Sequence, residues 1–414
     1  MVERPQPLKA PRSRITASLA VFFVAVFFKA QFGHASQLDD MERSLAISQP
    51  QFKDLAAYGA DMVFFITNRK ANPAALAGAH AEVAEFDDYF LNAQSPTLVL
   101  GEVCVTHPLN RQIAEQNFND IPEPDNPVKY FALERPNSEP GKDSLKIALR
   151  NVETSKYYAD CIAHNKINLN DDLSHSTNDR PTIYIHGWNT SFKSAITRAA
   201  QIALDLSRGP ILVVTWPSDI SGDINLTPMH QIGAYRKAES VEKTAIVLVP
   251  LAIDLAESAS GKSLAVVAHS MGARLYVNAL HAMHATRSKI LINIDVAVLA
   301  APDVAKSDFE NMLNEIPIFT DNFTIYCAAD VALLFSEALH GQTPLGECKS
   351  KKPDGPSPQQ MVRVSGKMSD PFRHSYFLSA RELIDDISNV FKLADSHPGP
   401  SRSTFYQMRS IELK

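Results

Sequence analysis

Apolar and polar positions change their spacing along the chain, and from residue 182 onward two patterns alternate. Short runs that are apolar throughout are typical of buried strands, which we predict over 182–185, 211–215, 264–267, 292–299, 323–327 and 361–364. Stretches with apolar residues about every 3.6 positions predict helices beginning at Ser191 and over 229–260, 271–285, 304–316, 332–339 and 377–391. Such alternation indicates a parallel sheet covered by helices on both faces.

The chain before residue 182 shows strand patterns without helical patterns between them. Runs rich in β-branched and aromatic residues predict strands over 62–67, 97–105, 128–133 and 145–152. We therefore expect an α/β fold with a mostly parallel central sheet and antiparallel N-terminal strands. In this interpretation a linker covers 36–59, a single α/β domain covers 60–395, and a weakly ordered tail covers 396–414.

The first 35 residues have the pattern of a targeting segment. Basic residues precede an apolar run over 15–28, and a Gly-His-Ala sequence permits cleavage after Ala35. The run falls short of the ~20 residues that cross a bilayer as a helix. We therefore predict a signal peptide over 1–35 and an exported protein, periplasmic or secreted. The alternative is an uncleaved inner-membrane anchor over 15–28, which would hold the protein near the membrane.

Composition narrows the class of protein. A content of 45% hydrophobic and 21% charged residues suits a globular chain with a sizeable core. The net charge of −6, without a basic tract, gives no reason to expect a nucleic-acid partner. No cysteine and histidine spacing suggests a metal site, and we expect no cofactor.

The four cysteines can pair if the chain is exported into an oxidising compartment. We favour Cys327–Cys348 and Cys104–Cys161, because each pair closes a loop within one region of the chain. The alternative is four free thiols in the core.

The strongest chemical signal is the sequence Ala268-His269-Ser270-Met271-Gly272, which lies between a predicted strand and a predicted helix. A serine on such a turn projects its hydroxyl above the sheet edge, and small residues two positions before and after it let strand and helix approach. Ala268 departs from the usual glycine but is small. We predict that Ser270 is a nucleophile; the alternative is a serine that caps the helix.

A nucleophilic serine needs a histidine base and a carboxylate, which follow it in the order acid, then histidine, in this kind of site. His374 follows the last predicted strand and precedes the last helix, and His340 is its main competitor. Asp330 directly follows the strand over 323–327, one strand before His374. Asp303 follows the preceding strand and is the alternative acid, and the acid that is not used would suit a helix N-cap.

An acyl-transfer site also needs donors for the oxyanion. We expect the backbone N–H of Met271, just after the nucleophile, and the N–H of Trp188 in the loop His186-Gly187-Trp188-Asn189. Gly187 would let this loop turn tightly toward the substrate. Trp188 could instead be a core aromatic residue, and residues 215–218 could line the pocket or pack in the core.

The chain resembles a family of largely uncharacterised bacterial α/β-hydrolases of the esterase and lipase superfamily. The likeness runs from about residue 61 to residue 387 and is clearest at five segments: 64–69, 185–192, 268–272, 299–303 and 374–377. The resemblance implies an α/β-hydrolase fold and a triad of Ser270, Asp330 and His374. It implies no particular substrate.

Three functions fit these residues. The first is hydrolysis of a carboxylic ester through an acyl-enzyme, with a small ester or acyl compound as substrate. The second keeps the same triad but acts as an acyltransferase, a thioesterase or an amidase. The third is a non-catalytic binding protein with the hydrolase fold, because fold alone does not fix function. The sequence leaves the oligomeric state open.

Overall fold

The computed structural model describes residues 58–72, 90–108, 128–133, 181–206, 211–218, 228–260, 264–285, 294–316, 323–348, 360–366, 368, 373–396 and 409–413. The strands are β1 Tyr58–Ala71, β2 Phe90–Pro108, β3 Val128–Leu133, β4 Thr182–Ile185, β5 Ile211–Thr215, β6 Leu264–His269, β7 Ile294–Ala300, β8 Phe323–Cys327, β9 Gln360–Gly366 and β10 Arg409–Leu413. The helices are α5 Phe192–Asp205, α6 Pro228–Ala245, α7 Leu248–Ser260, α8 Met271–Ala285, α9 Lys306–Glu315, α10 Val331–His340, the 3-10 turn η5 Tyr376–Leu378 and α11 Arg381–Ser396.

These strands form a ten-stranded sheet in the order β10-β9-β8-β7-β6-β4-β5-β1-β2-β3. The pairs β1–β2 and β2–β3 are antiparallel, whereas β1–β5 and every pair from β5 to β10 are parallel. The expected fold class, a mostly parallel sheet with antiparallel N-terminal strands, is therefore confirmed.

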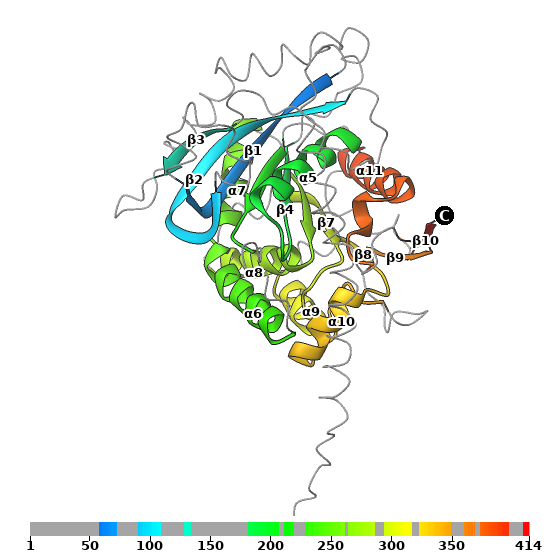
Figure 1. Cartoon of the computed structure of the whole chain (residues 1–414). Helices are drawn as coiled ribbons and strands as arrows, with labels where there is room; N and C mark the ends of the chain where they lie inside the picture. Colours follow the sequence, from blue (N-terminus) through cyan, green and yellow to red (C-terminus); the bar gives the residue numbers. More distant parts are fainter. Residues whose placement is uncertain are drawn as a thin grey trace, which may run out of the picture.

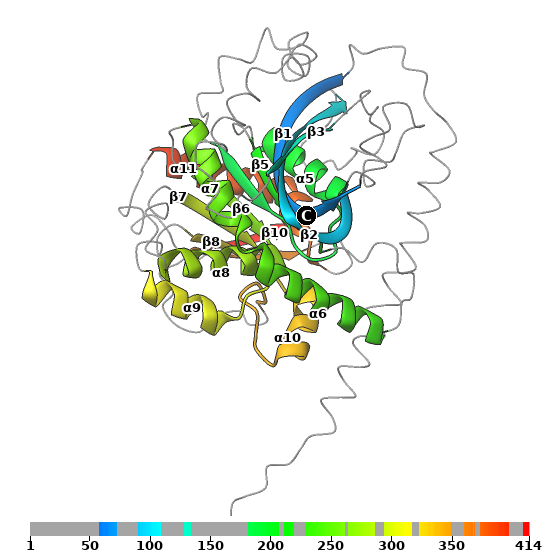
Figure 2. The same ribbon diagram turned by 90° about the vertical axis from the view of Figure 1, so that its left-hand side faces the viewer.

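Helices cover both faces of the sheet, and each face has its own apolar cluster. On one face α5 and α11 pack against the strands through buried residues such as Ile196 and Ile387. On the other face α6, α7, α8 and α9 do the same, with Leu275 and Phe309 fully buried. Figures 1 and 2 show α8 and α9 on one side of the strands and α5 on the other. Burial on both faces explains why the central strands are apolar throughout.

The helix predicted over 229–260 is two helices, α6 and α7. Pro250 lies in the first turn of α7, and its ring cannot follow a continuous helix because it lacks an N–H and collides with the carbonyl four residues earlier. The carbonyl of Ile246 instead accepts from the N–H of Val249 at 3.3 Å, which closes a tight turn between the two helices. The helix predicted over 377–391 is likewise divided, into η5 and α11.

The C-terminal residues do not match the expected tail. Strand β10 pairs in parallel with β9, from Arg409 beside Val362 to Leu413 beside Gly366. Leu413 is buried in the apolar cluster on the α11 face. The sheet therefore extends beyond the predicted boundary at residue 395, and the strand over 361–364 is not the last one.

Several predictions fall outside the described residues: the segment 1–35 with its apolar run, the linker up to residue 57, the strand over 145–152, and Cys161. None of the helices described here combines the length and the apolar character needed to cross a membrane.

Candidate active site

Ser270 lies on a strained turn between β6 and α8. Its φ of 53° falls in the left-handed region, which residues with a β-carbon seldom adopt. The turn is held by the backbone: Ser270 N–H donates to Ala300 O at 3.0 Å, and Ser270 O accepts from Ala273 N at 3.0 Å and from Asp303 N at 3.1 Å. This geometry agrees with the predicted nucleophile turn rather than with an ordinary helix N-cap.

The space around this turn explains its sequence pattern. A β-carbon at Gly272 would lie 2.4 Å from His186 O, so any larger residue would push β4 away from α8. A β-carbon at Gly187 would lie 2.8 Å from the Ser270 β-carbon. Glycine is thus required at position 187 because the loop passes close to Ser270, and not because of its backbone conformation. The residue of this loop with a left-handed φ is Asn189. The methyl group of Ala268 is fully buried within β6 and is accommodated.

His374 and Asp330 form a direct pair, with His374 Nδ1 2.6 Å from Asp330 Oδ2. A carboxylate can only accept, so Nδ1 carries the proton in this bond and Nε2 of the neutral ring is left unprotonated. Asp330 is fully buried, whereas the His374 side chain is 16% exposed. Burial raises the pKa of Asp330 above its ordinary value, and the adjacent His374 opposes this shift.

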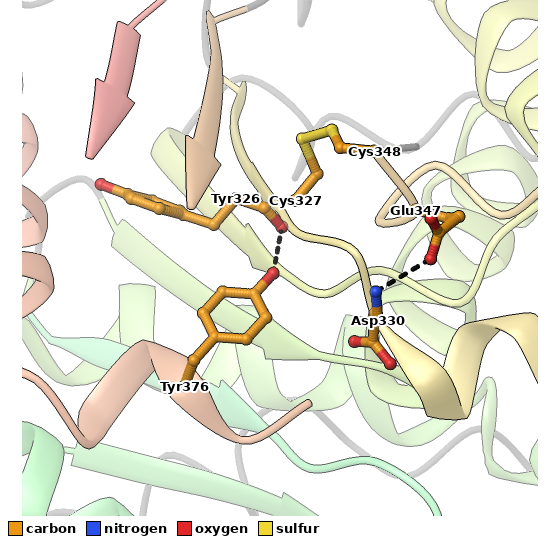
Figure 3. Close-up of a disulfide and its surroundings, with 6 residues drawn as sticks. All are labelled: Tyr326, Cys327, Asp330, Glu347, Cys348 and Tyr376. Carbon is orange, nitrogen blue, oxygen red and sulfur yellow. Dashed lines mark hydrogen bonds between the residues drawn. A yellow bond between two sulfur atoms is a disulfide. The ribbon is translucent and has the colours of Figure 1, made fainter. Parts of the chain in front are cut away.

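The other polar atoms of Asp330 are also engaged. Its Oδ1 accepts from Leu333 N at 3.0 Å and so caps α10. Its backbone N–H donates to Glu347 Oε2 at 3.0 Å, a contact drawn in Figure 3. These bonds fix the carboxylate in one orientation toward His374.

The loop that carries Glu347 is tied to the end of β8. Cys327 and Cys348 form a disulfide with their Cα atoms 5.6 Å apart, as predicted, and Figure 3 shows this disulfide together with Glu347 and Asp330. Cys348 N–H donates to Ala328 O at 2.8 Å, and Ala328 N–H donates to Gly346 O at 3.1 Å. The segment that carries Asp330 is therefore held in place by two backbone hydrogen bonds and by a disulfide.

The two competing residues lie in a different network. Asp303 accepts from the Tyr235 hydroxyl and from Ser336 Oγ, the latter at 2.6 Å, and Arg274 Nη1 is 4.0 Å away. His340 Nε2 lies 2.7 Å from Glu239 Oε1. Capping by Asp303 is also not observed, because α9 has Ala305 at its N-cap without a side-chain hydrogen bond.

The two predicted oxyanion donors, the N–H groups of Trp188 and Met271, lie in the loop after β4 and at the start of α8. Neither Trp188 N–H nor Met271 N–H donates to a backbone carbonyl of the described residues, whereas the next N–H along, that of Asn189, donates to Ser218 O at 2.8 Å. The Trp188 ring packs edge-on against Tyr235, with centroids 5.1 Å apart, and lines the cavity described below.

The buried side chain of His186 supports the loop that carries Trp188. His186 Nε2 accepts from Trp216 N–H at 3.1 Å, and its other ring nitrogen donates to Gly187 O at 2.9 Å. Burial, together with the charge of Arg69, lowers the pKa of His186 to about 3, so the ring is neutral. The Trp216 ring stacks on His186, so residues 215–218 support the loop rather than line the pocket.

Arg69 is a second support that the sequence analysis did not find. It is fully buried, and its Nη2 donates to Thr190 O at 2.7 Å while its Nε donates to Thr215 Oγ1 at 3.1 Å. A local signal was present, since Arg69 lies in β1 shortly after the apolar run over 62–66. Its partners, more than 100 residues away in sequence, gave no local pattern.

The predicted nucleophile and the predicted base border a cavity of about 280 Å³. Ser270, His374 and Trp188 all line it, and Asp303 and Tyr235 form part of the wall. No group of histidine, cysteine and carboxylate side chains that could hold a metal occurs among the described residues. The arrangement is suited to chemistry by a serine and a histidine.

An α/β hydrolase presents its serine on the turn after a central parallel strand, and the described sheet and turn have this arrangement. The chain belongs to the family described as alpha/beta hydrolase of unknown function (DUF900), which matches residues 162–390. The expected resemblance to an uncharacterised α/β-hydrolase family is thereby confirmed. Membership supports hydrolase activity and leaves the substrate open.

Three solved structures show a weaker likeness. A lipase-esterase related protein from Clostridium acetobutylicum ATCC 824 is 11% identical, with a TM-score of 0.22, 58% of this chain covered and 87% of its own. ESTFA in an Fe-lacking apo form is 11% identical, with a TM-score of 0.21 and coverages of 57% and 66%. A variant of tomato methylketone synthase I complexed with beta-ketoheptanoate is 13% identical, with a TM-score of 0.20 and coverages of 57% and 89%. No curated protein matches the chain.

Proposed function

We propose that this protein hydrolyses carboxylic esters through an acyl-enzyme formed on Ser270. The observation that carries the proposal is the 2.6 Å bond from His374 to the buried Asp330, at a cavity that Ser270 also lines. That bond orients the histidine and places the ring proton on Nδ1, so that the unprotonated Nε2 can act as the base. Ser270, Asp330 and His374 are the residue types that this chemistry requires, and they follow one another in the order used by the α/β-hydrolase fold.

In the first half of the reaction, Ser270 Oγ attacks the ester carbonyl carbon while His374 Nε2 takes the hydroxyl proton. The resulting imidazolium is stabilised by the ionised carboxylate of Asp330, which stays unprotonated. The tetrahedral intermediate then collapses: the bond to the alcohol oxygen breaks, and His374 returns its proton to that oxygen. The products are an acyl-enzyme on Ser270 and a free alcohol.

In the second half, water takes the place of the alcohol. His374 accepts a proton from the water as its oxygen attacks the acyl carbon, and it returns a proton to Ser270 Oγ as the acyl bond breaks. We assign the N–H groups of Trp188 and Met271 as donors to the oxyanion in both halves. Each such donor is typically worth about 3 kcal/mol of transition-state stabilisation.

We also propose export, because the segment 1–35 has the charge and length pattern of a signal peptide. A disulfide between Cys327 and Cys348 is compatible with an oxidising compartment. Mass spectrometry of the mature protein would test this: an N-terminus at Ser36 supports cleavage, and an intact N-terminus in the membrane fraction contradicts it.

The test of the activity is a series of para-nitrophenyl esters of increasing acyl length on purified protein. We expect turnover by the wild type and a loss of at least about a thousandfold in kcat in Ser270→Ala. The matched control is Ser307→Ala, which removes an exposed hydroxyl on α9 and should leave the rate unchanged. A folded wild type that turns over none of the esters, or a Ser270→Ala variant with full activity, would contradict the proposal.

A further inference from the structure

The cavity beside Ser270 has two unlike walls. One group of lining residues comes from α10 and is apolar: Ala332, Leu333 and Phe335. A second group comes from β4, the loop after it and α5 and is polar: Tyr184, Thr190, Ser194 and Arg198. A substrate that fills the cavity therefore meets both hydrocarbon and one arginine side chain, that of Arg198.

The position of Arg198 is fixed by its own helix. Ser194, Arg198 and Gln201 follow one another at helical spacing on one side of α5. Arg198 Nη1 donates to Gln201 Oε1 at 2.8 Å, and Gln201 Nε2 in turn donates to the carbonyl of Leu378, at 2.9 Å. Because Leu378 ends the η5 turn just after His374, this chain of bonds holds the guanidinium next to the segment that carries the base.

The charge of Arg198 is not matched by a contact. In the parts of the chain that the structure describes, Arg198 makes no ion pair, and its hydrogen bond to Gln201 uses one of five N–H donors. Burial lowers the pKa of Arg198, while Asp205 and Tyr184 oppose that shift through space. An unpaired charge on a largely buried side chain is costly, and an anion bound beside it would reduce that cost.

The remaining charges around the cavity specify where an anion can bind. His269 lies against the rings of His374 and Phe377, and burial lowers its pKa well below the ordinary range, so it adds no positive charge. Asp303 lies in the wall with Tyr235 and would repel an anion there. Arg198 is thus the cationic partner that the described wall offers.

We propose that the substrate is an ester that carries a carboxylate, which binds Arg198 while an apolar arm packs against α10. This inference rests on the proposed ester hydrolysis and specifies its substrate class. A planar guanidinium matches a carboxylate with two parallel hydrogen bonds, and one guanidinium balances one negative charge. A phosphate dianion fits less well, because the lining residues include no lysine and no second arginine.

The experiment compares matched ester pairs that differ only in a carboxylate. On the acyl side, para-nitrophenyl hydrogen adipate is compared with para-nitrophenyl hexanoate. On the alcohol side, para-acetoxybenzoate is compared with its methyl ester. For each pair we measure the ratio of kcat/KM between the anionic and the neutral ester. The fraction of folded enzyme, and any change in rate that affects both esters equally, cancel in this ratio.

We expect the wild type to prefer the anionic ester in at least one pair, which also identifies the arm that carries the charge. Arg198→Gln should lower that ratio about tenfold or more, which corresponds to the loss of a charge-assisted hydrogen bond. Arg198→Lys, which keeps the charge, should retain part of the preference. Lys193→Gln removes a charge from the same helix outside the cavity wall and should leave the ratio unchanged.

Two results would overturn the inference and leave ester hydrolysis intact. One is a wild type that prefers the neutral ester in both pairs. The other is an Arg198→Gln variant with an unchanged ratio. If the wild type hydrolyses none of these esters, both the substrate assignment and the ester hydrolase proposal fail together.

Discussion

At the scale of single residues, the local sequence around the two candidate acids is nearly equivalent. Asp303 and Asp330 each follow a buried parallel strand and precede a helix. What separates them is long-range: Asp330 is bonded to His374, 44 residues away, and Asp303 to Tyr235, 68 residues away. The sequence therefore predicted both positions as candidates, and only the packed structure shows which one meets the histidine.

Substitution of the two carboxylates by amides should give different results. Asp330→Asn loses the charge that holds His374 in its tautomer, and kcat should fall by about 10³–10⁴-fold. Asp303→Asn should keep kcat within about tenfold of the wild type but lower the free energy of unfolding by about 1–3 kcal/mol. The reason is that an amide has one acceptor oxygen for the two buried hydroxyls, of Tyr235 and Ser336, that donate to the carboxylate. Steady-state kinetics and urea unfolding of both variants measure this. Loss of activity in Asp303→Asn alone would require a different triad.

At the scale of secondary-structure elements, most helices and strands followed directly from their spacing. The strands β3, β4, β5 and β8 and the helix α8 have the predicted bounds. The errors have local and non-local causes. Pro250 divides a stretch whose apolar spacing continues through it. Strand β10 has the sequence Arg-Ser-Ile-Glu-Leu, without an apolar run that would identify it in the absence of its partner β9.

The loop 344–348 is the clearest case of an element whose role the sequence could not show. Its residues have no regular spacing, yet Glu347 accepts the Asp330 N–H and Cys348 is crosslinked to Cys327. The cysteine pairing was predictable from loop closure. The contact of Glu347 with the acid was not, because it depends on where that loop crosses the end of β8.

We expect Glu347 to position Asp330 and not to take part in the chemistry. Glu347→Ala removes the acceptor for the Asp330 N–H and should lower kcat about tenfold, the value of a lost hydrogen bond to a charged group, with KM little changed. Glu347→Gln keeps an acceptor oxygen and should restore most of kcat. Glu310→Ala, at an exposed position of α9, is the control. Equal kcat in the alanine and glutamine variants would argue against a positioning role.

At the scale of the whole molecule, the site is assembled from segments that follow several parallel strands. The loop at residues 186–190 follows β4, Ser270 follows β6, Asp330 follows β8, and His374 follows β9. Because parallel strands end at the same edge of a sheet, residues far apart in sequence meet there. Chain order and strand periodicity predicted this meeting. The buried supports Arg69 and His186, by contrast, were found only from their contacts.

The buried neutral His186 should make stability depend on pH. Its pKa is about 3 in the folded protein and about 6.5 in the unfolded chain, so between these values only the unfolded chain takes up the proton. The free energy of unfolding should therefore fall as pH decreases through this window, by about 1.4 kcal/mol per pH unit from this residue alone.

Urea unfolding at several pH values, for the wild type and His186→Gln, isolates this contribution. Glutamine retains an acceptor for Trp216 N–H but does not titrate. The wild-type slope should exceed the variant slope by about 1.4 kcal/mol per pH unit between about pH 6 and about pH 4. Identical slopes would mean that His186 is not held neutral by its burial.

The most direct test of the proposed mechanism is covalent labelling with a fluorophosphonate, followed by peptide mass spectrometry. An activated serine hydroxyl displaces the fluoride, and the proposed triad predicts one adduct, on Ser270. Ser270→Ala should give no adduct, and His374→Ala should react at least about a hundredfold more slowly because the base is missing. A folded wild type that stays unlabelled, or an adduct on another residue that persists in Ser270→Ala, would contradict the assignment of Ser270 as nucleophile.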